Sequence, residues 1–122
     1  MIALDGSFLV NYPINGKIVQ YDYSGAALRD YAVSSGVGDG CIAVYDGVMA
    51  ALDTVRFEII MFDLATGEQT DVIEFAGQNI IYNPGVNSIE TALSFNGDGL
   101  AIACGDGIYV YDGQGFAKLT GG

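Results

Sequence analysis

The chain has 122 residues but no histidine and no tryptophan, and only two of its residues are cysteine. Without histidine it lacks the base of Ser-His-Asp triads and of Cys-His pairs, which excludes the common nucleophilic mechanisms. Two cysteines alone also fall short of the ligand set of a zinc site. We therefore expect no catalytic residue, no metal ligand and no cofactor, and we predict that the protein is not an enzyme.

Positive charge is scarce as well. Four lysine or arginine residues stand against fifteen acidic residues, which gives a formal net charge of −11. Proteins bind nucleic acids largely by neutralising phosphates with lysine and arginine, and anionic membrane surfaces attract the same residues. The composition thus argues against nucleic-acid and membrane partners, and it leaves proteins, basic ones included, as the expected partners.

Long apolar runs are absent, because no stretch approaches the roughly 20 residues that span a bilayer. The first residues, Met1–Gly6, lack the basic region of a signal peptide. We expect a soluble protein without a signal peptide, located in the cytoplasm or in a virus-like particle assembled there.

Charged residues of both signs make up only 16% of the chain, whereas about 25% is usual, and 51% of the residues are hydrophobic. A domain of this length exposes a large share of its surface to water. So low a charge content indicates that part of this surface is buried against other chains.

What the chain does contain is a repeat. A β-prone run that ends in an aromatic residue and an aspartate occurs three times, at Ile18–Asp22, Ile59–Asp63 and Ile108–Asp112. The closing aspartates lie 41 residues (22 to 63) and 49 residues (63 to 112) apart. Periods of this size are typical of β-propellers, in which each blade is a four-stranded sheet.

Turn residues divide the copies into short strands. Asn-Gly and Asp-Gly pairs such as Asp46-Gly47 and Asn96-Gly97 supply the positive φ angles of tight hairpins. The strands expected in the last two copies are 41–45, 48–52, 57–62 and 70–75, then 89–95, 100–104, 108–111 and 116–119. We predict an all-β chain of about three four-stranded antiparallel blades, at residues 1–35, 41–76 and 89–120.

Residues Ser94–Asp112 resemble the body of a WD-repeat propeller blade, and Met61–Glu68 is similar to the end of another. The likeness covers most of the chain. The tryptophan of the family signature is replaced by Tyr21, Phe62 and Tyr111, and its Gly-His pair is missing. The resemblance implies a degenerate propeller relative in which the family's hydrogen-bonded tetrad is not expected.

Three blades are fewer than the four to eight of closed propellers, so two apolar blade faces would remain open. We expect two chains to complete a six-bladed ring; the alternatives are a segment of a larger assembly and packing on a different protein. The predicted function is a non-catalytic assembly or protein-interaction module, a self-associating structural subunit of a larger particle such as a virion. The alternative is a lectin-like propeller that binds carbohydrate between blades.

Candidate contact residues lie in loops and near strand ends. The turn-rich segment 76–88 lengthens the second period, and its Tyr82 and Asn83 are candidates for partner or ligand contact. Tyr12, Tyr23 and Tyr31 fall near strand ends, where a phenol stacks on a sugar or anchors a protein. The alternatives are a passive connection for the loop and core packing for the tyrosines.

The remaining chemical motifs have plainer interpretations. Aspartates that precede glycine indicate turns rather than a catalytic pair or a cation site; they are Asp5, Asp39, Asp46, Asp98, Asp106 and Asp112. Cys41 and Cys104 occupy different blade positions, which favours thiols over a disulfide. Gly36–Gly40 lacks the lysine of a phosphate-binding loop and is expected to link two blades.

Overall fold

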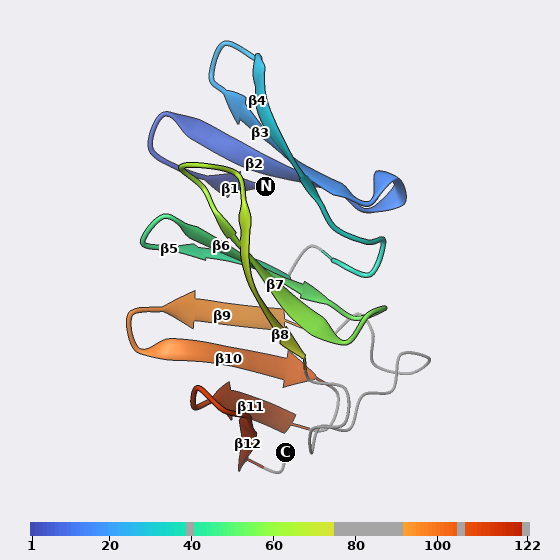
Figure 1. Cartoon of the computed structure of the whole chain (residues 1–122), viewed down its shortest axis with the longest axis vertical. Coiled ribbons are helices and arrows are strands. Elements are labelled where there is room, and N and C mark those ends of the chain that lie inside the picture. The colour runs from blue at the N-terminus through green and yellow to red at the C-terminus, as the bar shows by residue number, and fades with distance from the viewer. Residues whose placement is uncertain (39–40, 75–91, 105–106, 121–122) are drawn as a thin grey trace.

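Three four-stranded antiparallel sheets, each formed from consecutive strands, are stacked one upon another along the long axis of the chain (Figure 1). The structure is a computed structural model, and it describes residues 1–38, 41–74, 92–104 and 107–120. The all-β class and the three four-stranded sheets predicted from the repeat are thereby confirmed.

The first sheet contains β1 (Ile2–Ala3), β2 (Ser7–Tyr12), β3 (Lys17–Asp22) and β4 (Ala27–Ala32), with a 3-10 turn, η1 (Pro13–Asn15), between β2 and β3. The second contains β5 (Ile42–Tyr45), β6 (Val48–Asp53), β7 (Glu58–Asp63) and β8 (Gln69–Glu74). The third contains β9 (Ala92–Asn96), β10 (Gly99–Cys104), β11 (Gly107–Tyr111) and β12 (Phe116–Thr120). In each sheet the strands pair in chain order.

The sequence period reappears in the strands. Adding 41 to the bounds of β2 and β3 gives those of β6 and β7. The pairing of the third and fourth strands shifts at equivalent points, Gln20/Tyr21 in the first sheet and Met61/Phe62 in the second. The first two sheets are therefore copies of one unit down to the position of an irregularity in pairing.

Local turn chemistry explains where strands begin. Asp46 and Gly47 have φ angles of 51° and 75°, the pair of positive values that a two-residue hairpin needs between β5 and β6. The sequence predicted that β7 begins at Phe57, but Phe57 has a φ of 57°, in the left-handed region. A left-handed residue is incompatible with an extended strand, so β7 begins one residue later.

Each sheet has two faces. The leading face is the one that turns toward the preceding sheet of the stack, and the trailing face is the one that turns toward the following sheet. The leading face carries residues that are opposite one another in the second and third strands: Phe8, Val10, Val19 and Tyr21 in the first sheet; Met49, Ala51, Ile60 and Phe62 in the second; Leu100, Ile102, Tyr109 and Tyr111 in the third. The trailing face carries the alternate residues: Leu9, Ile18 and Tyr31; Ala50, Leu52, Ile59 and Met61; Ala101, Ala103, Ile108 and Val110.

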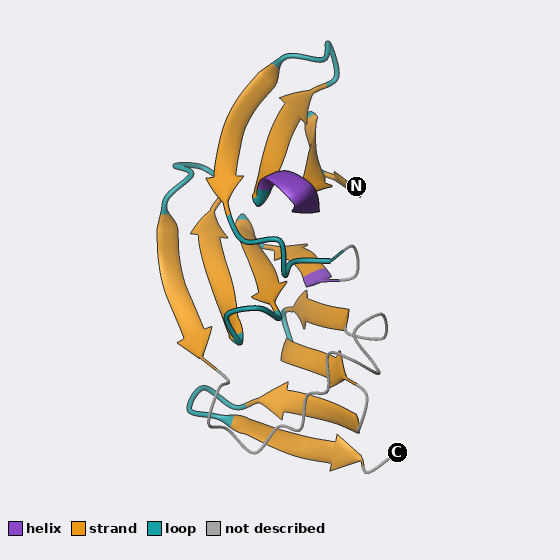
Figure 2. Cartoon of the chain, turned by 90° about the vertical axis from the view of Figure 1, so that its right-hand side faces the viewer, coloured by secondary structure: helices purple, strands orange, loops and turns teal. Residues whose placement is uncertain are grey.

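The sheets pack leading face on trailing face. Tyr31, on the trailing face of the first sheet, contacts Phe62 edge-on with 5.2 Å between ring centroids. Tyr45, at the end of the trailing face of the second sheet, contacts Phe95 of the third in the same way at 5.9 Å. Buried residues of all three sheets form one hydrophobic core, and β5 lies beside β9 (Figures 1 and 2).

The link between the first two sheets is fixed to both of them. Asn11 donates a side-chain hydrogen bond to the carbonyl of Val37 (2.8 Å), and the carbonyl of Gly36 accepts from the backbone nitrogen of Thr54 (3.1 Å) and from its hydroxyl (2.9 Å). A Cβ on Gly36 would lie 2.5 Å from the backbone nitrogen of Val55, so only glycine fits there. Residues 36–38 therefore act as the predicted linker; residues 39–40 lie outside the described part.

Candidate functional site

The aspartates that close the repeat organise turns. Asp22 accepts hydrogen bonds on Oδ1 from the backbone nitrogens of Ser24 (2.9 Å) and Ala26 (3.1 Å). Asp63 and Asp112 accept equivalent bonds from residues two positions ahead, at 2.8 and 2.9 Å. Hydrogen bonds from Ser24 lower the pKa of Asp22, and those from the backbone of Gly115 and Gln114 lower the pKa of Asp112. In all three copies the repeated aspartate thus accepts backbone hydrogen bonds that shape the turn.

One buried carboxylate, Asp53, was not predicted from the sequence. Asp53 ends β6 with its side chain fully buried, and its Oδ1 accepts hydrogen bonds from the backbone nitrogens of Val55 (3.0 Å) and Arg56 (3.1 Å). Its Oδ2 lies 3.9 Å from Nε of Arg56. These contacts hold the turn between β6 and β7, on which Gly36 packs. The signal available beforehand was a lone aspartate directly after the apolar run 48–52.

An aromatic cluster covers part of the leading face of the first sheet. The rings of Phe8 and Tyr21 stack with 5.6 Å between centroids, and Tyr23 lies 5.1 Å from Phe8. The hydroxyls of Tyr12 and Tyr21 are 2.8 Å apart, and this hydrogen bond raises the pKa of Tyr21. Phe8 and Tyr21 are only half-buried, and Tyr23 is 66% exposed.

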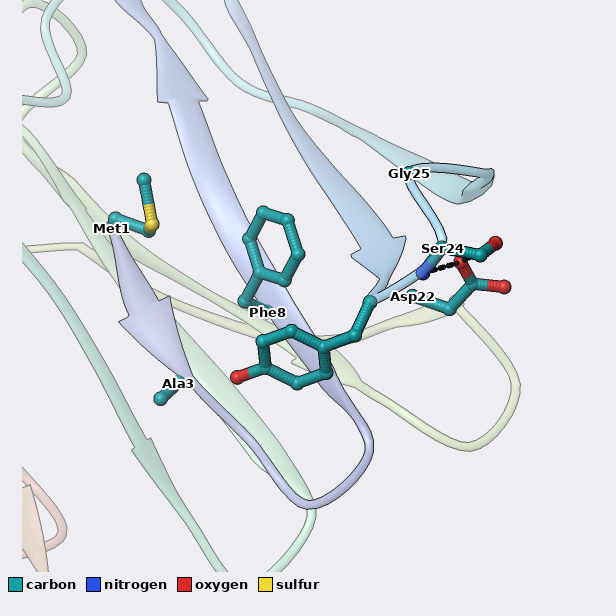
Figure 3. A pocket seen from close by; sticks show the side chains of 7 residues that line it. Met1, Ala3, Phe8, Asp22, Ser24 and Gly25 are labelled. Carbon is teal, nitrogen blue, oxygen red and sulfur yellow. Dashed lines mark hydrogen bonds between the residues drawn. The ribbon is translucent and has the colours of Figure 1, made fainter.

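A hollow of about 550 Å³ opens at one end of this cluster. Figure 3 shows the Phe8 ring between Met1 on one side and the turn that contains Asp22 and Ser24 on the other. Tyr23 and Ala3 complete much of its lining. The hollow combines aromatic rings with polar turn groups.

The trailing face of the third sheet is also open, but it carries small and aliphatic side chains in place of aromatic rings. It consists of small and β-branched residues, and Ile108 and Val110 are 39% and 36% exposed. Ala101 and Ala103 lie beside them, opposite Ser94 and Ala92 of β9. Two shallow hollows of about 240 and 150 Å³ lie over this face.

The predicted contact residues fall in three situations. Tyr12 belongs to the aromatic cluster and Tyr23 is exposed beside the hollow. Tyr31 is 1% exposed, packs on Phe62 and donates a hydrogen bond to Gln20 (2.8 Å). It is therefore a core residue and is not accessible to a partner or ligand. The predictions for Tyr82 and Asn83 lie outside the described residues.

Sequence reasoning did not single out Phe8, Ile108 or Val110, which lie on the two open faces. In their strands the side chains that point to either face of the sheet are apolar, and this pattern indicates that both faces are covered. The pattern does not tell which face of which copy lacks a neighbour, because that depends on the order in which the sheets stack.

Acidic and cysteine residues show no metal-binding arrangement within the described ranges, where no three of them cluster in a way that would hold an ion. In the turn at 96–99, Oδ1 of Asn96 accepts a hydrogen bond from the backbone nitrogen of Asp98 (2.8 Å), as in an ordinary turn. Asp106, another of the aspartates that precede glycine, lies with Gly105 outside the described residues. Cys41 is buried in the core.

Comparison with models of protein families and with curated proteins finds no match to this chain. Among the described residues, no helix has the length and apolar character needed to cross a membrane.

Proposed function

We propose that the chain is a non-catalytic, propeller-like assembly module that associates with copies of itself. The observation that carries the proposal is the contrast between covered and open faces. The leading-face residues of the second sheet, Met49, Ala51, Ile60 and Phe62, are all buried. Their counterparts in the first sheet are Phe8, Val10, Val19 and Tyr21. Val19 is buried, but Phe8, Val10 and Tyr21 are half-buried, since no described sheet lies on them.

Trailing faces show the same contrast. Leu52 and Ile59 of the second sheet are fully buried beneath the third sheet, whereas their counterparts Ala103 and Ile108 in the third sheet are not. Surfaces built for burial between sheets are thus presented to solvent at both ends of the stack. Contiguous apolar patches of this kind mark interaction sites.

The energetics favour a closed ring of two chains. Each 100 Å² of apolar surface removed from water contributes roughly 2.5 kcal/mol, and association costs at least about 4 kcal/mol in lost freedom of motion. A two-chain ring forms two interfaces for one loss of that freedom. With three sheets from each chain, the ring would have six, within the range of known propellers.

The resemblance to WD-repeat blades supports this arrangement. Tyr21, Phe62 and Tyr111 stand where that family has tryptophan, and all three lie on leading faces. The contact of Phe62 with Tyr31 is one instance of an aromatic residue in this position packing on the preceding sheet. In the ring, Tyr21 packs in the same way on a sheet of the second copy, and the finished unit serves as a building block of a larger particle.

Sedimentation velocity over a wide range of protein concentration tests the proposal. We expect a species of twice the chain mass of 12.8 kDa. The association should strengthen with added salt, because the contact is apolar while each chain carries a net charge of −11 and repels its partner. A monomer at every concentration and salt level would refute self-association.

Carbohydrate binding is the second candidate, and the hollow beside Phe8 and Tyr23 is the observation that favours it. Aromatic rings stack on sugar rings, and the neighbouring turn with Asp22 and Ser24 offers polar groups. A glycan array with the wild type and Tyr23→Ala tests it. Reproducible binding that the substitution abolishes supports a lectin, and an array without signal removes this candidate.

A further inference from the structure

We infer that the contact between copies is head-to-tail, with the leading face of the first sheet of one copy packed on the trailing face of the third sheet of another. This inference rests on the proposed self-association and specifies its interface. The two open faces are different surfaces, so the contact is heterologous, and two such contacts close a ring.

The stack of sheets has a polarity. Both contacts between sheets within the chain join a trailing face to a leading face, as Tyr31 with Phe62 and Tyr45 with Phe95 show. A head-to-tail contact between copies continues the same packing at both ends of the stack (Figure 2). A contact of two leading faces, or of two trailing faces, has no counterpart between the described sheets.

The two open faces are complementary in shape. The leading face of the first sheet presents the rings of Phe8, Tyr21 and Tyr23. The trailing face of the third sheet presents small residues such as Ala101 and Ala103, with hollows of about 240 and 150 Å³. Bulky side chains fill such hollows, whereas two trailing faces brought together would leave voids and forfeit dispersion contacts.

Charge also favours contact between unlike faces. Lys17 and Asp30 lie 3.9 Å apart at the edge of the leading face of the first sheet. Two leading faces in contact would bring two such pairs close together and bury part of them, at a desolvation cost. The trailing-face residues Ala101, Ala103, Ile108 and Val110 are uncharged, and Asp98, which lines the smaller hollow, is a single charge. A head-to-tail contact therefore brings no second charged pair against the first.

Two single substitutions test the polarity. Val10→Lys places a charge in the leading face of the first sheet, and Val110→Lys places one in the trailing face of the third. Val55→Lys is the matched control, because Val55 is exposed in the turn between β6 and β7, away from both faces. An unpaired lysine buried in an interface should weaken association at least about 100-fold. Circular dichroism checks that each variant is folded.

Head-to-tail packing predicts that Val10→Lys and Val110→Lys are each monomeric, and that the control associates like the wild type. An equal mixture of the two variants should give a one-to-one complex, since each supplies the face that the other has lost. If only one of the two substitutions abolishes association, the contact joins like faces and the inference is overturned. A monomeric wild type overturns the proposed function itself.

A cross-linking measurement stands in if either lysine variant fails to fold. Val10→Cys and Val110→Cys, each combined with Cys104→Ser, are milder changes, and Cys41 is buried in the core. A bifunctional thiol reagent then links faces that meet. Head-to-tail packing predicts covalent dimers in the mixture of the two variants and none in either variant by itself. Dimers of one variant by itself would show contact between like faces.

Discussion

Replacing Phe62 by alanine should destabilise the chain strongly, because Phe62 joins the first sheet to the second. Its side chain is buried in the leading face of the second sheet and contacts the ring of Tyr31. Truncating a buried phenylalanine typically costs about 3–5 kcal/mol, of which the edge-on ring pair accounts for roughly 1 kcal/mol. Whole domains have about 5–15 kcal/mol of stability, so this one change removes a large part.

Urea unfolding followed by tyrosine fluorescence measures the loss, at one fixed protein concentration so that association does not confound it. Ile14→Ala is the matched control, since Ile14 is 97% exposed at the tip of η1 and its truncation should change stability by less than about 0.5 kcal/mol. A loss below about 1 kcal/mol for Phe62→Ala would refute the packing of the first sheet on the second through this residue.

Three further predictions concern the link and the turns. Gly36→Ala should lower the free energy of unfolding by about 1–3 kcal/mol, because its Cβ would lie 2.5 Å from a backbone nitrogen, whereas Gly38→Ala should leave it nearly unchanged. Equal urea midpoints for the two variants would contradict this difference. Hydrogen bonds lower the folded-state pKa of Asp22 and Asp112, so their stabilisation is present above the ordinary value of 3.8 and is lost as the pH falls through the lowered values. Melting curves of the double variant Asp22→Asn/Asp112→Asn should therefore respond less to acid than those of the wild type, and parallel curves would argue against the prediction. Arg29→Ala removes a 2.6 Å hydrogen bond to the carbonyl of Leu64, in the turn after β7, and should lower the free energy of unfolding by about 1–2 kcal/mol in urea; an unchanged midpoint would mean that this contact adds nothing.

The repeat made the strands predictable. Short β-prone apolar runs, Asp-Gly turns and the aromatic-Asp ending recur along the chain, and these local signals decide where β6 and β7 lie to within one residue. The role of Asp112 as a turn residue followed from the same local chemistry, and Asp22 has the same role although no glycine follows it. Local signals suffice here because a hairpin is closed by residues that are near in sequence.

The candidate site was less predictable, because its residues matter through contacts between sheets. Tyr31 and Tyr23 look alike in the sequence, yet one packs on Phe62 and the other is exposed. Asp53 is buried because the turn that it holds packs on the linker at Gly36, about 17 residues before it. Which face is open depends on the stacking of whole sheets, and the period of a single strand carries no information about it.

Native mass spectrometry of the wild-type protein tests the central claim most directly. If both ends of the sheet stack are covered by a second copy, the spectrum shows a complex of two chains, each of 12.8 kDa. The complex should persist as the protein is diluted and dissociate into single chains when either end face carries a lysine. Finding single chains alone, even at the highest protein concentration measured, would contradict the two-chain ring.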